Sequence, residues 1–258
     1  MNVDIKDFYF NGRYLSSFGG YVGSSGGFQE LTALPSREFI TDRAVGQDGV
    51  SIFDSYLTPR TFVVSVVFHD ITAVTIRDIA TWLNVKTPTE FYWKNDDIKI
   101  NVMIDGDSAS SFRLLAEKTG FAEIKFIAHD PYFYELDETI YSGSFTSIPD
   151  VGSFASIEIL NYGTEISYPI ITLSASGDIV VEIKDVLGTV VQRLTVNNAI
   201  TNLYVDNKNR IVTHNGGQSA YTLLLDGRFI NIPVGEYTME ITAVTGTTYT
   251  IYPKFRWL

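Results

Sequence analysis

Apolar and polar residues alternate along most of the chain, which is the pattern of β-strands with one face against a core. In the first half, these runs cover residues 8–10, 61–68, 90–93, 98–104 and 122–127. The run at 61–68 is almost wholly apolar, so we expect it to be buried on both faces or held in a contact between subunits. The chain is therefore predicted to be mainly β.

One stretch has helical rather than strand spacing. Its apolar stripe repeats at i, i+3, i+4 and i+7, and consists of Ile76, Ile79, Ala80 and Leu83. We predict one α-helix from about residue 72 to residue 84, with Thr72 or Thr75 as the N-terminal cap.

Turn residues separate the predicted strands, and their spacing along the chain differs between the two halves. Asn11-Gly12 predicts a hairpin, because both residues tolerate a positive φ. Beyond Glu135 we expect strands of about five to eight residues, separated by turns at 162–164, 175–178, 215–217 and 226–227. Short, regularly spaced strands are typical of a β-sandwich. The predicted domains are therefore an N-terminal domain, residues 1–137, and a C-terminal β-sandwich, residues 138–258.

Composition agrees with this class and limits the partners. The chain contains 15 Tyr and 17 Phe, which favour pleated surfaces, and no Cys, which excludes disulfides and thiolate sites. Its net charge of −11 disfavours nucleic acid as a partner. No apolar run is long enough to cross a membrane, and no secretion signal starts the chain. We therefore expect synthesis in the host cytoplasm and no membrane insertion.

The sequence offers little to catalysis. His69, His129 and His214 are scattered, and the acidic pairs at 96–97 and 105–107 are typical of solvated turns. A nucleophile elbow and a phosphate-binding lysine motif are both missing from the sequence. A glycosidase or peptidase would need a carboxylate pair or a metal triad, which we cannot assemble. We predict no enzyme, and no catalytic, cofactor or metal site.

Several of these features recur together in one protein family. They are Phe8 to Gly12, the turn at 46–49 leading to Tyr56-x-x-x-Arg60, the Trp82-Leu83 helix end and Phe126-x-x-x-Asp130-Pro131-Tyr132. Later features are Asn161 to Thr164, Tyr168-Pro169-Ile170, Leu203 to Asp206 and Phe255-Arg256-Trp257. In this order, over nearly the whole chain, they resemble the distal tail proteins of long, non-contractile-tailed bacteriophages and prophages.

The resemblance implies a structural role in the virion. It implies an N-terminal β-rich domain with one helix that builds a homo-hexameric ring, and a galectin-like or carbohydrate-binding-module-like C-terminal sandwich. The expected partners are the tail tube protein, the tail-tip protein and a receptor-binding protein. The expected place is the tail tip, as a baseplate hub in host adsorption. We expect the ring contacts in residues 1–137, because the apolar 61–68 run lies there.

A binding module is the alternative hypothesis. Sugar sites present planar aromatic rings flanked by polar groups. In the C-terminal half, the candidates for contact with host cell-wall polysaccharide are Tyr204, Tyr221, Tyr237 and Trp257.

Overall fold

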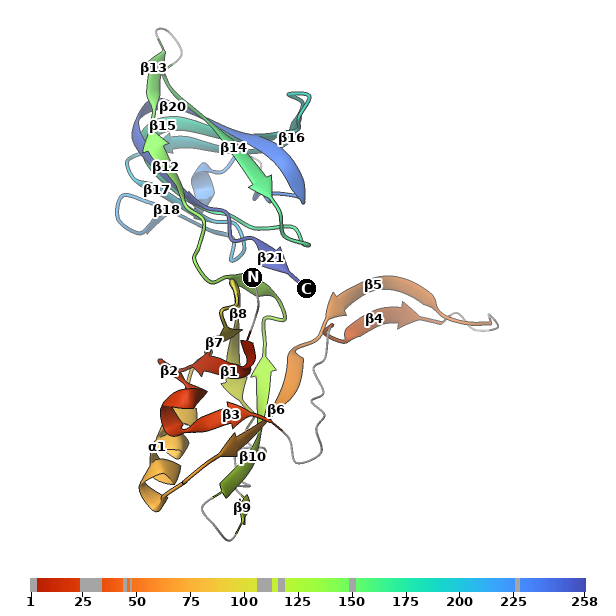
Figure 1. The fold of residues 1–258 in the computed structure, drawn as a ribbon. Coiled ribbons are helices and arrows are strands. Elements are labelled where there is room, and N and C mark those ends of the chain that lie inside the picture. The colour runs from red at the N-terminus through yellow and green to blue at the C-terminus, as the bar shows by residue number, and fades with distance from the viewer. Residues whose placement is uncertain are drawn as a thin grey trace. The chain divides into compact units, whose positions relative to one another are not determined.

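The protein is mainly β, as predicted, in a computed structural model that describes residues 4–23, 34–43, 46, 48–105, 113–115, 119–148, 152–225 and 228–258. Figure 1 shows the strands and the one α-helix of this described part. The chain divides into two compact units, Met1–Leu136 and Asp137–Trp257. Each unit has its own hydrophobic core.

An antiparallel sheet forms the first unit. Its main path runs in the order β2-β1-β7-β8-β10-β6-β3, while β9 pairs with β10 and β11 with β8. A short 3₁₀ helix, η1, covers Leu15–Phe18. The strands of this sheet are β1 Asp4–Phe10, β2 Arg13–Tyr14, β3 Gly20–Val22, β6 Arg60–Phe68, β7 Thr89–Lys94, β8 Ile98–Ile104, β9 Arg113–Leu115, β10 Thr119–Ala128 and β11 Phe133–Glu135.

The predicted hairpin and helix are both confirmed. Asn11 and Gly12, at φ 42° and 80°, turn β1 into β2. Helix α1, Ala73–Leu83, begins after Thr72, whose hydroxyl accepts from the Thr75 amide at 3.2 Å. The predicted apolar stripe is wrong at Ala80, which is exposed. Trp82 is buried in its place, because its large ring fills the space against the aromatic core.

The apolar run at 61–68 lies inside its own sheet. Strand β6 pairs with β10 along one edge and with β3 along the other. Phe62, Val64 and Val66 are buried in the core, whereas Val63 and Ser65 are half-buried. The run therefore stabilises the first unit from within, and the exposed apolar surface of this unit lies elsewhere.

Two of the motifs that carry the family resemblance are distant in the sequence but meet beside this strand. The buried Arg60 donates through Nε to the Pro131 carbonyl oxygen at 3.2 Å, and its guanidinium lies 4.8 Å from the Phe133 ring centre. Burial lowers the pKa of Arg60. Position 60 thus ties β6 to the chain that follows β10, which explains why an arginine there suits the fold.

A second antiparallel sheet forms the C-terminal unit and curls around its own core. Its main path is β13-β14-β20-β15-β17-β18-β19, while β12 pairs with β20 and β16 with β15. The elements are β12 Tyr141–Ser144, β13 Thr146–Ile148, β14 Gly152–Asn161, β15 Ile170–Lys184, β16 Val190–Ala199, β17 Leu203–Asp206, β18 Ile211–His214, β19 Gln218–Ser219, η2 Tyr221–Leu223, β20 Gly235–Tyr252 and β21 Arg256–Trp257.

Several strands here are longer than predicted. β15 has 15 residues and β20 has 18. The expected turn at 175–178 is instead a bulge inside β15, where Gly177 takes φ 82° and the pairing register shifts. The turns at 162–164 and 215–217 separate strands as predicted, while the turn at 226–227 falls outside the described residues. The galectin-like detail stays a prediction.

Candidate assembly surface and candidate pocket

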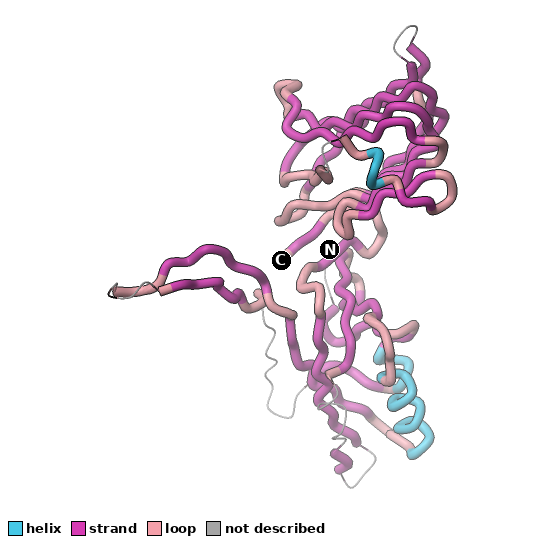
Figure 2. Tube along the Cα trace, turned by 180° about the vertical axis from the view of Figure 1, so that it is seen from behind, coloured by secondary structure: helices cyan, strands magenta, loops and turns pink. Residues whose placement is uncertain are grey.

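A separate hairpin carries the main exposed apolar surface of the first unit. It consists of β4, Arg37–Asp42, and β5, Ser51–Leu57, and we call it the arm. Within the described chain, β4 and β5 pair with each other and with no other strand. Figures 1 and 2 show the arm leaving the larger sheet of its unit. At its base the Thr58 amide donates to the Ser36 carbonyl oxygen at 2.8 Å.

Polar contacts hold both faces of the arm. Arg37 Nη1 donates to Ser55 Oγ at 2.9 Å on one face. On the other, the Tyr56 hydroxyl donates to Glu38, and this hydrogen bond and the carboxylate charge raise the pKa of Tyr56. These contacts keep the hairpin formed although neither face packs on the rest of the described chain.

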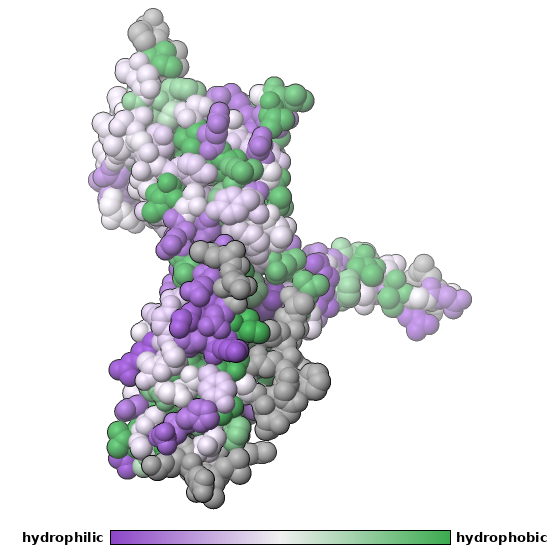
Figure 3. Space-filling view, in the orientation of Figure 1, coloured by the Kyte–Doolittle hydropathy of each residue, from purple (hydrophilic) through white to green (hydrophobic). Residues whose placement is uncertain are grey.

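Five large apolar side chains of the arm are 50% to 69% exposed: Phe39, Ile40, Ile52, Phe53 and Tyr56. Figure 3 shows green, hydrophobic surface along the arm. Burying one such side chain contributes about 1.5–3 kcal/mol, and an isolated two-stranded hairpin is marginal in water. An apolar hairpin of this kind is therefore typical of a surface that is covered in an assembly.

The sequence contains a signal for this surface that the strand pattern alone did not reveal. Each of the two strands that flank the 46–49 turn has two apolar residues next to each other in the sequence, Phe39-Ile40 in one and Ile52-Phe53 in the other. Adjacent strand residues point to opposite faces, so both faces of such a hairpin are apolar. Only the structure shows that nothing in the described chain covers them.

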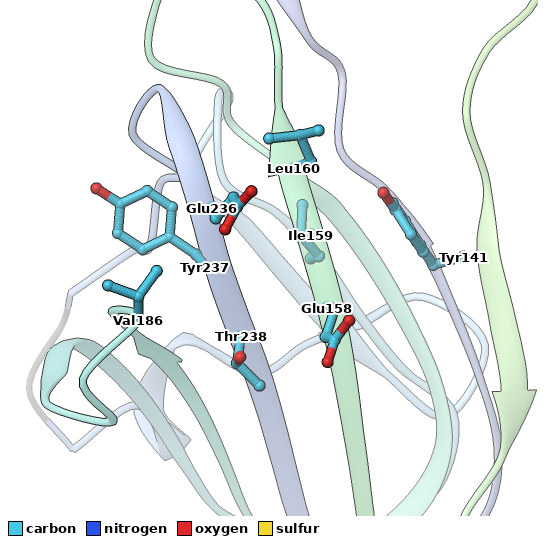
Figure 4. A pocket seen from close by; sticks show the side chains of 8 residues that line it. All are labelled: Tyr141, Glu158, Ile159, Leu160, Val186, Glu236, Tyr237 and Thr238. Carbon is cyan, nitrogen blue, oxygen red and sulfur yellow. The ribbon is translucent and has the colours of Figure 1, made fainter.

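The second unit contains an open pocket of about 490 Å³. Figure 4 shows it between β12, β14, β20 and the turn after β15. Glu158 lies opposite Thr238 and Glu236 opposite Leu160 in the β14–β20 register, so both carboxylates stand on one outer face. In the described residues neither carboxylate has an ion-pair partner. The full lining is Tyr141, Glu158, Ile159, Leu160, Val186, Glu236, Tyr237 and Thr238.

The chemistry of this pocket follows from its two glutamates. Unpaired carboxylates repel phosphate and other anions, and they accept hydrogen bonds from hydroxyl or ammonium donors. Sequence reasoning singled out Tyr237 but missed Tyr141, Glu158 and Glu236, because only pairing of β12, β14 and β20 brings them together.

The predicted sugar-contact aromatics lie on four different elements. Tyr237, on β20, lines the pocket, and Tyr204 is half-buried on β17. Burial, together with the charge of Asp206, raises the pKa of Tyr204, so its phenol stays protonated at neutral pH.

The other two aromatics pack against neighbouring rings. Tyr221, on η2, meets Phe229 edge to face at 6.2 Å between ring centres. Trp257, on β21, lies 5.8 Å from Tyr162. In the described part of the chain, no ring contact joins two of the four aromatics, so they do not form one platform. Their role in sugar contact stays a prediction.

Two absences hold for the residues described. No three His, Asp or Glu side chains converge there as metal ligands. No described helix is long and apolar enough to span a membrane.

Known proteins resemble this chain in two ways, by the fold and by a sequence family. No curated protein matches the chain. The crystal structure of the SPP1 Dit protein, described as a paradigm of the hub adsorption apparatus in phages that infect Gram-positive bacteria, matches with TM-score 0.68 and 18% identity, over 96% of this chain and 98% of that one. Two structures of the phage p2 baseplate in its activated conformation are more distant. The strontium form gives TM-score 0.46 and 8% identity, over 95% of this chain and 97% of that one. The calcium form gives TM-score 0.43 and 8% identity, over 92% and 97%.

The N-terminal unit also matches a family model. Residues 3–130 match the model described as the phage tail protein N-terminal domain. The matched segment covers strands β1 to β10, which include the arm, and helix α1 of the first unit. Residues 3–130 thus match the family of phage tail protein N-terminal domains, and the chain as a whole has the fold of the SPP1 Dit protein.

Proposed function

We propose that this chain is a non-catalytic hub subunit at the distal end of a phage tail. Copies of the chain form a ring, which the family resemblance makes a homo-hexamer. The ring joins the tail tube protein on one side to the tail-tip protein on the other, and so connects the tube to the host-adsorption apparatus and its receptor-binding protein.

The exposed apolar arm is the observation that supports this proposal. A hairpin has an unpaired edge on each strand, and such an edge can add to a sheet of a neighbouring copy. The contact is heterologous, because the arm of one copy meets a different surface of the next. Heterologous contacts that close by rotation produce a ring. The arm, rather than the 61–68 strand, is therefore the proposed ring contact of the N-terminal domain, residues 1–137.

The test compares the assembly state of the full wild-type chain with that of a variant in which two apolar side chains of the arm are made polar. The wild type is expected to reach six times the 28.8 kDa mass of one chain in light scattering, with rings in negative-stain images. Replacing Ile52 and Phe53 by serine should shift the mass toward the monomer. The matched control replaces Val186 and Leu187 by serine, two residues that are 73% and 87% exposed in the second unit.

Two results would overturn the ring role of the arm. One is an Ile52→Ser/Phe53→Ser variant that assembles like the wild type. The other is a wild type that stays monomeric at every concentration, even with the tail tube protein added. Loss of assembly in the control variant would place the contact in the second unit instead.

A further inference from the structure

A continuous row of hydroxyl groups crosses the sheet of the second unit. The pairing registers place one residue from each of six adjacent strands side by side. Every residue in the row carries a hydroxyl, and the six are Ser219 on β19, Thr213 on β18, Tyr204 on β17, Thr172 on β15, Thr250 on β20 and Ser142 on β12.

This row stands on the outer face of the sheet. None of its members is buried, whereas the residues on either side of Thr172 and Tyr204 along the chain are buried in the core. Successive strand residues point to opposite faces, so the row faces away from the core. A second row beside it repeats the chemistry, with Ser174 opposite Thr248 and Ser144 opposite Thr248.

A shallow hollow of about 230 Å³ adjoins the second row. Ser174 belongs to both, so rows and hollow form one surface, which we call the hydroxyl face. Ser176 and Thr245 share a hydrogen bond of 2.6 Å within it. Five hydroxyls and one amide line the hollow, whose residues are Ser174, Ala175, Ser176, Thr201, Asn202, Thr245, Gly246 and Thr247.

The hydroxyl face carries no acidic or basic residue, although the chain has a net charge of −11. The glutamates of the 490 Å³ pocket lie elsewhere, at the β14–β20 pairing. A face without charge offers no electrostatic attraction to a phosphate or to a basic peptide.

We propose that the hydroxyl face binds an uncharged polysaccharide. Serine and threonine hydroxyls both donate and accept hydrogen bonds, as sugar hydroxyls do, and half-buried Tyr204 adds an aromatic ring beside them. Neighbouring strands are roughly 4.8 Å apart, so the six-residue row extends roughly 24 Å. That length fits several sugar units in a chain rather than a single monosaccharide.

The chemistry argues against a protein partner on this face. Protein interfaces bury aromatic and aliphatic anchors at their centre. The two rows and the hollow offer only Tyr204 as a ring and Ala175, already buried, as an aliphatic group. Of the four aromatic residues considered for sugar contact, Tyr204 is the one that belongs to the row.

This inference goes beyond the hub role and can fail independently of it, because the arm lies in the other unit. The experiment measures binding of the full chain to immobilised neutral oligomers of glucose, galactose and N-acetylglucosamine, with a glycerol-phosphate polymer as the anionic probe. The Thr172→Val/Thr250→Val variant removes two hydroxyls and keeps the side-chain shape. Tyr204→Ala removes the ring, and Thr172→Glu adds a charge at an exposed position. The matched control, Thr242→Val, changes the same strand as Thr250 but lies outside both the hydroxyl face and the 490 Å³ pocket.

We expect saturable binding to at least one neutral oligomer. The Thr172→Val/Thr250→Val and Tyr204→Ala variants should each weaken it by about tenfold or more, because two hydrogen bonds or one ring contact are lost. Thr172→Glu should also weaken it, because its longer, charged side chain must be desolvated when a neutral chain binds over it. Thr242→Val should leave the affinity within about twofold, and all variants should keep the wild-type circular dichroism. Binding to no neutral oligomer, binding to the phosphate polymer alone, or neutral binding that ignores Thr172→Glu would each overturn the proposal. Ring assembly, followed on the same samples, reports on the hub role separately.

Discussion

The indole N–H of Trp82 donates to the backbone carbonyl oxygen of Phe10 at 2.6 Å. The contact is reciprocal, because Asn11 Nδ2 donates to the Trp82 carbonyl oxygen at 2.7 Å. The end of helix α1 is thereby fastened to the β1–β2 turn, which closes the aromatic core of the first unit. A buried carbonyl that loses its donor costs about 1–3 kcal/mol.

Replacing Trp82 by phenylalanine should therefore lower the free energy of unfolding by about 1–3 kcal/mol, measured by urea denaturation. Phenylalanine keeps an aromatic ring but is smaller than indole, so a packing loss adds to the lost hydrogen bond and a control is needed to separate the two. Trp93→Phe is the matched control, because in the described chain the half-buried Trp93 makes ring contacts but no indole hydrogen bond. Equal losses in the two variants would contradict the role given to the Trp82 bond.

The bulge at Gly177 should be intolerant of a side chain. Gly177 and Gly188 have φ 82° and 81°, but a Cβ at Gly177 would lie 2.7 Å from Val244 Cβ, whereas one at Gly188 would meet nothing within 4 Å. We expect Gly188→Ala to cost about 1–2 kcal/mol from backbone strain alone. Gly177→Ala should cost about 1–3 kcal/mol more, because overpacking is added. Thermal unfolding measures both, and matching costs would show that β20 moves aside freely.

Asp96 should make the stability depend on acid pH. Desolvation raises the pKa of Asp96 in the folded chain, against opposing hydrogen bonds from the Ile98 and Asp97 amides. The folded state thus binds this proton more tightly. The stabilising contribution of this bound proton is complete below pH 3.8, the ordinary pKa of an aspartate, and it is lost as the pH rises through the higher pKa of Asp96 in the folded state.

Asp96→Asn should accordingly be at least as stable as the wild type at pH 7, and its advantage should shrink as pH falls toward 3.8. Urea unfolding across this pH range measures the difference. Glu123→Gln, at an exposed position of β10, is the control for the loss of one carboxylate. A wild type that is the more stable protein at pH 7 would reverse the assigned sign.

Ring assembly should protect the amides of the arm. In an isolated chain β4 and β5 have few contacts, so their amides exchange among the fastest of the described strands. In assembled rings these amides should exchange at least about tenfold more slowly, because opening the arm then also breaks the contact with the next copy. Hydrogen exchange with mass spectrometry compares the two states. Unchanged exchange in the arm would remove it from the ring contact.

Local sequence signals determined the parts of this fold that depend on a few neighbouring residues. Asn11-Gly12 predicted the first hairpin because its positive φ values need no distant partner. Thr72 and the apolar spacing predicted α1 because cap and stripe lie within one helix. The order of motifs along the chain predicted a phage tail protein, which the family match over residues 3–130 confirms.

Tertiary structure alone decided the features on which the proposals rest. Gly177 looks like a turn residue in the sequence, yet the pairing of β15 with β20 makes it a bulge. The apolar 61–68 run and the apolar arm look equally suited to an interface, but in the described chain only the first is built into the larger sheet, with a strand along each edge. The hydroxyl row joins Ser142 to Ser219 through four other strands, and no local pattern specifies that register. The physical reason is that pairing and burial between distant segments depend on how the whole sheet curls, which the energetics of neighbouring residues does not determine.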